Sequence, residues 1–400
     1  MPDLKAIYLD ALRACAPETI LRGHSMNGLP RNVIAIGKCA GPLFDGLASV
    51  APIEQALVIV PLGYPAPARD SKSMRVLYGG HPQITSSSFD AGRVLLEFAG
   101  SIGEALVLIS GGASACVEAA LTPWLTSEDL ASVNARLLDV GFPIAQMNVV
   151  RRHLSAIKGG RLAARIGGRV VTMIFSDVAT GQLHDVGSGP TLADASTTAD
   201  AIDLMHRIGG CESQIERMSA HDFPDTPKSL DNIESQLLAD NSTFVAAAAR
   251  HAAARGWKVR RLDAQLECDV QSAAELLIEE AARLERGMLL AAGGEVTIRV
   301  AAAGGRGGRC SELAARFTLA ARQRGLRDVS ALFGSSDGVD GSSPAAAIVM
   351  QRVSDSPPSD HLLDAIRRSD TFSAAELLGE TVMIQPTGNN LRDLVLLARA

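Results

Sequence analysis

Two short segments combine glycines with basic or small polar residues in a way that suits the binding of an anion. Residues 304–309, GGRGGR, place four glycines around Arg306 and end at Arg309, before a predicted helix. Backbone N–H groups in such turns bind anions, and a guanidinium forms paired hydrogen bonds with phosphate. Residues 110–115, SGGASA, lead from a predicted strand into a predicted helix, whose first N–H groups also favour an anion. Both segments predict phosphate chemistry; a flexible hairpin and a tight turn are the structural alternatives.

A third segment, NVVRRHLSAIKGGRLA at 148–163, concentrates positive charge in a chain whose formal net charge is −6. On one helix, Arg151 and Lys158 would share a face opposite an apolar one, and the glycine pair that follows would end the helix. The helix dipole favours cations at its C-terminus, which accounts for Lys158 and Arg161 but not for Arg151 and Arg152. A solvated helix face and an anion-binding surface are the two interpretations.

Further polar residues come directly after predicted strands. Lys38 follows the apolar segment that begins at Asn32, without the pattern of a P-loop. His81 is an acid–base group or a loop residue. Asp177, Asp337 and Asp340 would bind Mg²⁺, orient a hydroxyl or cap turns. Ligands of open parallel sheets bind beyond the carboxyl ends of the strands, so these positions predict a cleft between two strand-end faces. The strand-end groups are Gly37-Lys38, His81, Ser110-Gly111-Gly112, Ser176-Asp177, Gly293-Gly294-Glu295, Asp337 and Thr387-Gly388.

These groups must be positioned by short β-branched segments that alternate with Ala- and Leu-rich helical ones. The alternation predicts an α/β fold with a parallel sheet covered on both faces. We expect strands within 32–38, 56–64, 75–82, 104–114, 169–178, 256–262, 287–300, 328–341, 345–350 and 381–390. Segment 287–300 predicts two strands around a Gly-Gly turn, and therefore a mixed second sheet. A polar stretch at 211–235 suggests two domains, 1–235 and a smaller 236–400.

Composition excludes several classes of function. The aromatic content is 4% and the isoelectric point about 5.8, which argue against nucleic-acid binding. No cysteine or histidine spacing predicts a zinc site, and the scattered cysteines suit free thiols. The chain shows no apolar run long enough to span a membrane and no signal core at its start, so we expect a cytoplasmic protein. No G-x-G-x-x-G follows a strand, which argues against a nicotinamide dehydrogenase.

Several motifs together resemble the glycerate 2-kinase family, whose C-terminal part is the MOFRL domain and whose members are often labelled hydroxypyruvate reductases. They occur in the family's order from about residue 37 to 393, so the resemblance covers nearly the whole chain. The motifs are GKCA, GGHP, SGGASA, MNVVRRHLSAIKGGRLA, SDV, GSGPT, GGE, GGRCSE, SDGVDG and PTGNNLRD.

The resemblance implies an ATP- and Mg²⁺-dependent kinase that phosphorylates the 2-hydroxyl of D-glycerate between a Rossmann-like N-terminal domain and a smaller C-terminal one. It places the family's functional lysine and arginine at Lys38 and Arg309. We add Asp177 as a catalytic group, with Asp337 and Asp340 as further metal ligands. A homodimer is an open expectation. Phosphate or substrate contacts are expected from Ser110, Gly111, Gly112, Ser114, Arg151, Arg152, Lys158, His81, Glu295, Gly307, Gly308, Glu312, Thr387 and Asn389.

The chain also departs from the family pattern. Cys310 and Ser311 replace Asn and Gln, Gln182 and Pro344 replace Asp, and Ala113 replaces a Gly that takes positive φ more easily. Losing these polar groups motivates two alternatives: a kinase for a larger sugar acid, and a non-catalytic protein that binds a nucleotide or acid. A hydroxypyruvate reductase is the weakest alternative, because the dinucleotide motif is missing.

Overall fold

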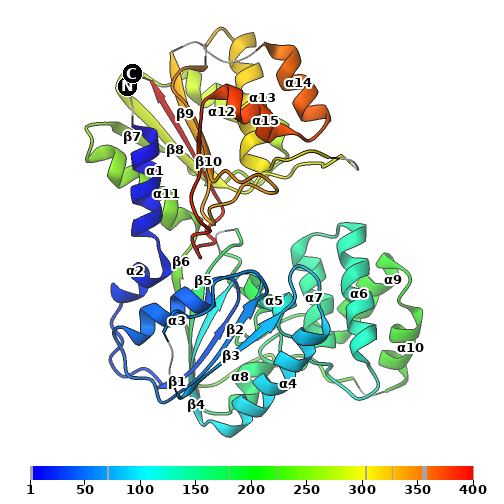
Figure 1. Ribbon diagram of the computed structural model, residues 1–400. Coiled ribbons are helices and arrows are strands. Elements are labelled where there is room, and N and C mark those ends of the chain that lie inside the picture. Colours follow the sequence, from blue (N-terminus) through cyan, green and yellow to red (C-terminus); the bar gives the residue numbers. More distant parts are fainter. Residues whose placement is uncertain are drawn as a thin grey trace. The chain divides into compact units, whose positions relative to one another are not determined.

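The computed structural model describes residues 3–69, 72–179, 181–221, 223–301, 304–326, 328–353 and 358–399. Contacts divide the chain into two compact units (Figure 1). The central unit is the continuous segment Ile20–Leu238, and the terminal unit combines Met1–Thr19 with Ala239–Ala400. The contacts thus group the first residues with the C-terminal part, whereas the expected domains were 1–235 and 236–400. The division into domains 1–235 and 236–400 stays a prediction.

The central unit contains a six-stranded sheet of order β3-β2-β1-β4-β5-β6. Strands β1 to β5 pair in parallel, with Ile36 of β1 opposite Ile59 of β2 and Ile109 of β4. The order reverses direction between β1 and β4, which is the switch point where doubly wound sheets bind ligands. The strands are β1 (Asn32–Ile36), β2 (Gln55–Pro61), β3 (Met74–Gly79), β4 (Glu104–Ser110), β5 (Arg169–Phe175) and β6 (Ile233–Ala239).

Helices cover both faces of this sheet, as the near-continuous apolar strands predicted. Ile34 and Ile36 of β1 share one core cluster with Val94 and Leu95 of α4 (Ser86–Ser101) and with residues of α8 (Arg161–Ile166). The alternate strand residues face the other side, where α3 (Ala40–Ala48) packs on β1 and β2. Parallel strands buried on both faces are the α/β arrangement expected from the sequence.

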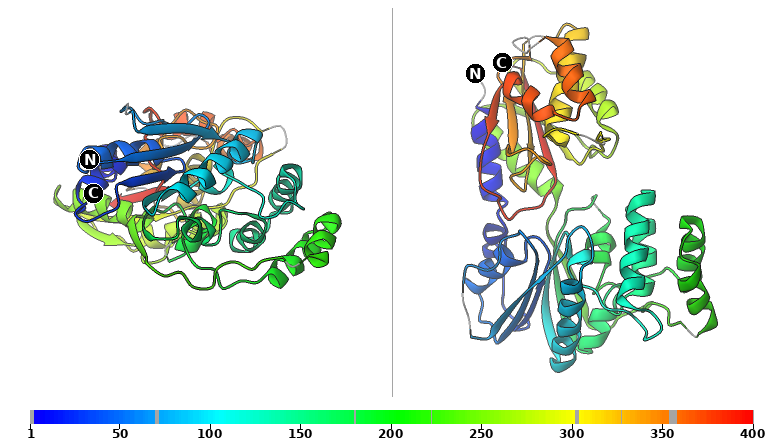
Figure 2. Two further views of the ribbon diagram at one scale, coloured as in Figure 1. Left: turned by 90° about the horizontal axis from the view of Figure 1, so that it is seen from below. Right: turned by 45° about the vertical axis from the view of Figure 1, so that its right-hand side comes forward.

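A group of helices extends from the central sheet and has a core of its own. It consists of α6 (Ser127–Val140), α7 (Ile144–Leu154), α9 (Thr198–Ile208) and α10 (Glu212–Ala220). Leu137, Val150, Met205 and Ile215 contribute to that core. Helices α6, α9 and α10 lie apart from the strands in both views of Figure 2. The short helices α2 (Pro17–Arg22) and α5 (Ala113–Cys116) and the 3-10 helix η1 (Leu183–Ser188) complete the elements.

The terminal unit contains a mixed sheet of order β11-β10-β9-β12-β8-β7. Strands β7 and β8 pair in parallel, and the other pairs are antiparallel. A mixed second sheet was expected. The strands are β7 (Lys258–Arg261), β8 (Met288–Gly294), β9 (Val329–Ser335), β10 (Ala347–Met350), β11 (Glu380–Val382) and β12 (Asp393–Arg399). The helices are α1 (Leu4–Ala14), α11 (Asn241–Ala253), α12 (Val270–Ala282), α13 (Arg309–Gln323), α14 (Ser359–Arg367) and α15 (Thr371–Leu378).

The start of the chain is held within the terminal unit by burial and by hydrogen bonds. Helix α1 packs against α11, and Tyr8 lies with its ring centroid 6.3 Å from that of Phe244. The Tyr8 hydroxyl donates to the carbonyl of Ser335 at 2.6 Å, and the Asn389 amide donates to the carbonyl of Cys15 at 2.9 Å. These contacts explain why the first residues group with the C-terminal part.

Three details of the predicted elements were wrong. The helix expected to reach Lys158 ends at Leu154, because Ser155 turns extended and pairs with Ala120 in a β-bridge. Segment 287–300 contains one strand rather than two, since after Gly294 only Thr297 forms an isolated bridge. Strands β6 and β12 were not predicted. In the described ranges, no helix has the length and apolarity needed to cross a bilayer.

Candidate active site

The loops after β1, β3 and β4 meet at the switch point of the central sheet. The N–H of Lys38 donates to the carbonyl of Gly111 at 2.9 Å, and the N–H of Cys39 donates to Ser110 Oγ at 3.0 Å. A side chain added at Gly112 would lie 3.1 Å from carbons of both His81 and Lys38. The structure therefore brings together Lys38, His81 and the SGGASA segment, as expected from their positions after strands.

Two glycines allow this convergence. Gly37 has a φ of 117°, and a Cβ there would lie 2.5 Å from the carbonyl oxygen of Ser110. Gly112 has a φ of 80°. Both positions therefore require the left-handed backbone that glycine adopts without strain. Ala113, which departs from the family pattern, begins α5 and is not among the residues with positive φ, so the strain expected for it does not arise.

Lys38 is the half-buried positive charge of this cluster. Its ammonium lies 5.6 Å from the ring centroid of Tyr64, and it forms no ion pair within the described part of the chain. His81 is half-buried, and burial, together with the charge of Lys38, lowers the pKa of its imidazole to about 4. At neutral pH the cluster therefore presents one cation beside an uncharged imidazole.

The two serines of SGGASA have different surroundings. Ser110 is fully buried and joins the β1 and β4 loops, so its hydroxyl is structural. Ser114 is half-buried, and its hydroxyl lies 2.8 Å from that of Ser188. Only Ser114 leaves its hydroxyl accessible to a ligand.

Two of the four charges of the basic segment are balanced by carboxylates inside the protein. Lys158 is 1% exposed and forms an ion pair with Glu118, which also accepts from Ser155. Arg152 is 7% exposed and contacts two aspartates. Arg151 is half-buried, and its guanidinium donates to Asn134 Oδ1 at 2.9 Å. Internal carboxylates therefore account for two of the four cations, and a contact of these residues with a ligand stays a prediction.

Asp177 lies where the sequence predicted it, two residues beyond β5, and it is half-buried. The departure at Gln182 lies on an exposed residue just before η1. Asp177 therefore stays a candidate within the central unit.

In the terminal unit, Arg309 belongs to a network of alternating charges. It forms ion pairs with Glu295 and with Asp393, whose Oδ2 lies 3.2 Å from the Arg309 Nε. Glu295 also pairs with Arg392, which pairs in turn with Glu267. Burial acts to lower the pKa of Arg309, but Asp393 and Glu295 outweigh it and raise that pKa above its ordinary value.

The predicted anion nest at 304–309 is filled by groups of the protein itself. Asp340 accepts hydrogen bonds from the N–H groups of Cys310 and Ser311 at 2.8 and 2.9 Å, at the start of α13. The N–H of Gly307 donates to Ser342, and that of Gly308 to Ser311. Because Asp340 is 2% exposed, a carboxylate already occupies the anion position of this helix.

The other predicted residues of the terminal unit have local partners. Glu312 pairs with Arg316 one turn along α13. Thr387 donates to the carbonyl of Ser336 at 2.6 Å, while Asn389 binds the start of the chain. Asp337 Oδ1 accepts from Ser335 and from the N–H of Val339. These contacts give each residue a structural role, and their expected ligand contacts stay predictions.

Sequence reasoning missed several residues that shape these sites. Glu118, Asn148, Ser188, Arg392 and Asp393 are all buried and charged or hydrogen-bonded. All except Glu118 lie within the motifs GSGPT, PTGNNLRD and MNVVRRHLSAIKGGRLA, which did not single out these positions. Polar residues within apolar surroundings require partners, which is a reason to examine them.

Comparison with known proteins shows which families and structures this chain resembles. Residues 3–221 match a family described as a domain of unknown function, DUF4147, and residues 288–393 match the MOFRL family. The glycerate 2-kinase of Pyrococcus horikoshii is 28% identical over 91% of this chain and 86% of its own length. A relative from Agrobacterium vitis, 30% identical over 98% of this chain and 92% of its own, carries a hydroxypyruvate reductase name. The crystal structure of glycerate kinase from Thermotoga maritima matches with a TM-score of 0.88 and 25% identity, covering 99% of this chain and 98% of that one.

The chain thus has the fold of a kinase. It combines a doubly wound α/β unit, with a lysine at its switch point, and a unit with a mixed sheet. The chain belongs to the DUF4147 family, its C-terminal part matches the MOFRL family, and its relatives include proteins named glycerate 2-kinase. The resemblance noted in the motifs is confirmed.

Asp393 makes the stability of the terminal unit depend on pH. Burial raises the pKa of its carboxyl to about 7, and its Oδ1 has no hydrogen-bond partner in the described structure. Between about pH 4 and pH 7 the folded protein therefore retains a proton that the unfolded chain releases, so the free energy of unfolding falls as pH rises. We expect a loss of about 2–4 kcal/mol across this window.

The test compares urea unfolding of the wild type and Asp393→Asn at pH 5, 6, 7 and 8. The neutral amide should flatten the dependence. The comparison cancels other groups, such as His81, whose lowered pKa acts in the opposite sense between about pH 4 and 6.5. Parallel curves for the two proteins would show that Asp393 titrates normally.

Proposed function

We propose that this protein is a glycerate 2-kinase, which transfers the γ-phosphoryl group of ATP to the 2-hydroxyl of D-glycerate. The observation that carries the proposal is Lys38 at the switch point of the central sheet. It forms no ion pair in the described residues, beside His81 and the SGGASA segment. Relatives named as glycerate 2-kinases, and a TM-score of 0.88 to a glycerate kinase, support it.

Phosphoryl transfer is a reaction that a site with a lysine such as Lys38 can promote. The 2-hydroxyl oxygen forms a bond to the γ-phosphorus, the bond from that phosphorus to the β,γ-bridging oxygen breaks, and ADP leaves. The hydroxyl proton passes to solvent water. Such reactions are accelerated chiefly by positioning and by neutralising charge on the phosphoryl oxygens. Lys38 supplies that charge. A histidine with a pKa of about 4 is a weak base at neutral pH, so we assign His81 to binding rather than to proton abstraction.

Mg²⁺ fits this site only as a partner of the nucleotide. No group of three potential ligands is assembled for a metal among the described residues. Both oxygens of Asp340 accept backbone hydrogen bonds, and Asp337 Oδ1 accepts two. Mg²⁺ is commonly held by one or two carboxylates together with substrate phosphates, where it neutralises phosphate charge. We assign Asp177 to it because of its position, two residues beyond β5 at the strand ends of the sheet that also carries Lys38.

Coupling to enolase without a mutase tests the proposal, because enolase accepts 2-phosphoglycerate and not its 3-isomer. Purified protein with ATP, Mg²⁺ and D-glycerate should give a signal that depends on all three. Turnover only on longer sugar acids would support the alternative motivated by four departures from the family pattern, namely Cys310, Ser311, Gln182 and Pro344. Binding of ATP without turnover on any acid would indicate a non-catalytic relative, and oxidation of NADH with hydroxypyruvate would revive the reductase. The cleft between the two parts of the chain stays a prediction.

A further inference from the structure

The turn that contacts Ser114 has an unusual backbone. Gly187, Ser188 and Gly189 are three successive residues with left-handed φ values, of 60°, 61° and 62°. Ser188 lacks the freedom of glycine, so its conformation costs about 1–2 kcal/mol. Ser188 is fully buried. Surrounding contacts must therefore hold this serine in place.

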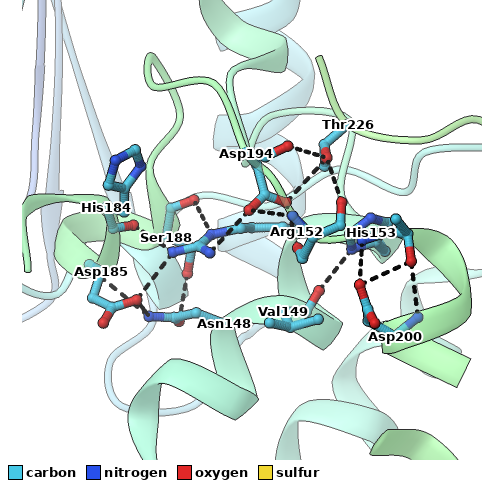
Figure 3. Close-up of polar contacts among 12 residues, drawn as sticks. Asn148, Val149, Arg152, His153, His184, Asp185, Ser188, Asp194, Asp200 and Thr226 are labelled. Carbon is cyan, nitrogen blue, oxygen red and sulfur yellow. Dashed lines mark hydrogen bonds and ion pairs between the residues drawn. The ribbon is translucent and has the colours of Figure 1, made fainter. Parts of the chain in front are cut away.

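Arg152 supplies those contacts (Figure 3). Its Nε donates to the carbonyl of Ser188 at 3.4 Å, and its Nη2 donates to the carbonyl of His184 at 2.7 Å. The guanidinium also binds Asp185 at 3.0 Å and Asp194 at 3.2 Å. The side chain is thus engaged on all three of its nitrogens and bridges α7 to η1, whose last residue is Ser188, and to Asp194.

The directions of the hydrogen bonds in this network are fixed by chemistry. Asn148 lies one turn before Arg152, and its Nδ2 donates to Asp185 at both the carboxylate, 2.9 Å, and the carbonyl, 3.4 Å. The carbonyl can only accept, so Oδ1 of Asn148 must face Ser188. An amide oxygen also only accepts, so the Ser188 hydroxyl donates to it, at 2.8 Å. The bond of 2.8 Å between Ser114 and Ser188 therefore takes its proton from Ser114.

This orientation leaves Ser114 as an acceptor. A hydroxyl has one proton, and that of Ser114 is committed to Ser188, so Ser114 Oγ offers only lone pairs to a ligand. Phosphate and carboxylate oxygens are also acceptors, so they form no hydrogen bond with Ser114 Oγ. The chain of hydrogen bonds ends at the amide of Asn148, which does not pass a proton on. Ser114 can therefore accept a hydrogen bond from a ligand hydroxyl that is not deprotonated in the reaction.

We infer that Ser114 is a specificity-determining residue that accepts a hydrogen bond from the non-reacting hydroxyl of the acid substrate. The inference rests on the proposed function, under which this group is the 3-hydroxyl of D-glycerate. Arg152, Asn148 and Ser188 are its positioning residues. The role replaces the phosphate contact that the sequence suggested for Ser114, and it gives the buried charge of Arg152 a function within the site.

Paired ligands test this assignment. D-Lactate has the carboxylate and 2-hydroxyl of D-glycerate but lacks the 3-hydroxyl. Calorimetry should show that the wild type binds D-glycerate more tightly than D-lactate. Ser114→Ala should reduce this preference about 3- to 10-fold, the value of one neutral hydrogen bond. The KM for ATP should not change. Ser213→Ala, an exposed serine on α10 of the same unit, is the matched control and should leave both quantities unchanged.

A second variant tests whether Ser188 acts by orienting the Ser114 hydroxyl or only by supporting the structure of the site. Ser188→Ala releases the proton of Ser114 and should reduce the preference about 2- to 5-fold. In the Ser114→Ala background the same change should have no further effect on the preference, since Ser188 acts through Ser114. A merely structural role of Ser188 would instead lower the affinity for both acids equally and additively.

The outcomes distinguish this inference from the proposed function, because calorimetry requires no turnover. A wild type that is inactive in the enolase assay, but whose preference for D-glycerate falls in Ser114→Ala, would refute the kinase function and support the role of Ser114. An active enzyme whose preference survives Ser114→Ala would overturn the inference alone. A change in the KM for ATP without a change in preference would overturn it too, in favour of a nucleotide hydroxyl. Failure of the wild type to bind either acid would overturn both.

Discussion

Replacing Lys38 with methionine is expected to lower kcat for D-glycerate about 10²- to 10³-fold, as the loss of one charged group at a developing phosphoryl charge does. The fold should remain, because Lys38 has no carboxylate partner in the described chain and its removal strands no buried charge. Enolase-coupled kinetics measures the effect, and thermal unfolding should show nearly the same midpoint for the variant and the wild type.

The matched control is Lys258→Met, which removes an exposed lysine on β7 and should leave kcat unchanged. Turnover of Lys38→Met within a few-fold of the wild type would show that Lys38 is not part of the site.

A substitution of Arg309 would be harder to interpret than the sequence suggested. Its removal would leave Asp393 and Glu295 without their cation, so stability would fall together with activity.

Breaking the buried pair of Lys158 and Glu118 should have the largest effect on stability. Their side chains are 1% and 3% exposed, and Glu118 also accepts from Ser155. Lys158→Met leaves a buried carboxylate without a counter-charge, which typically costs about 3–5 kcal/mol. We expect that loss in the free energy of unfolding, measured with urea and followed in a probe of the central unit.

Adding Glu118→Gln to Lys158→Met should recover most of the loss, since the amide keeps hydrogen-bonding capacity without charge. The control is Arg169→Met, which breaks an exposed pair with Glu234 and should change stability by less than about 1 kcal/mol. If Lys158→Met costs no more than this control, the pair contributes little, and an anionic ligand becomes the better account of Lys158.

The sequence predicted those parts of the fold that depend on local residue patterns, and it missed those that depend on residues far apart in the chain. Apolar β-branched runs identified the first five strands and placed Lys38 and Ser110 at strand ends, because this pattern is local. Strand β12 was missed because its run, LVLLA, is rich in Leu and Ala and equally typical of a helix. Its strand state depends on its neighbours β8 and β9.

The candidate site shows the same limit. The basic segment was noticed, but the partners of its charges lie far along the chain: Glu118 precedes Lys158 by 40 residues, and Asp194 follows Arg152 by 42. No spacing rule connects them. The glycines of 304–308 were assigned to an anion nest, which stays a prediction. The fold gives them a role in close packing that no motif indicated, with Gly308 against Asp340 and Gly307 against Thr371.

The attachment of α1 to the terminal unit has a consequence for biosynthesis. The central unit is an insertion between two parts of one discontinuous unit, and it can complete its sheet once the chain has been made to about Ala239. The terminal unit must wait, because β12 lies in the interior of its sheet between β9 and β8. During synthesis, α1 has to wait for its main packing partner α11 until the central unit has been made, and the sheet on which α11 packs is complete only when the last strand has emerged. The order of folding is thus the reverse of the order in which the two units begin.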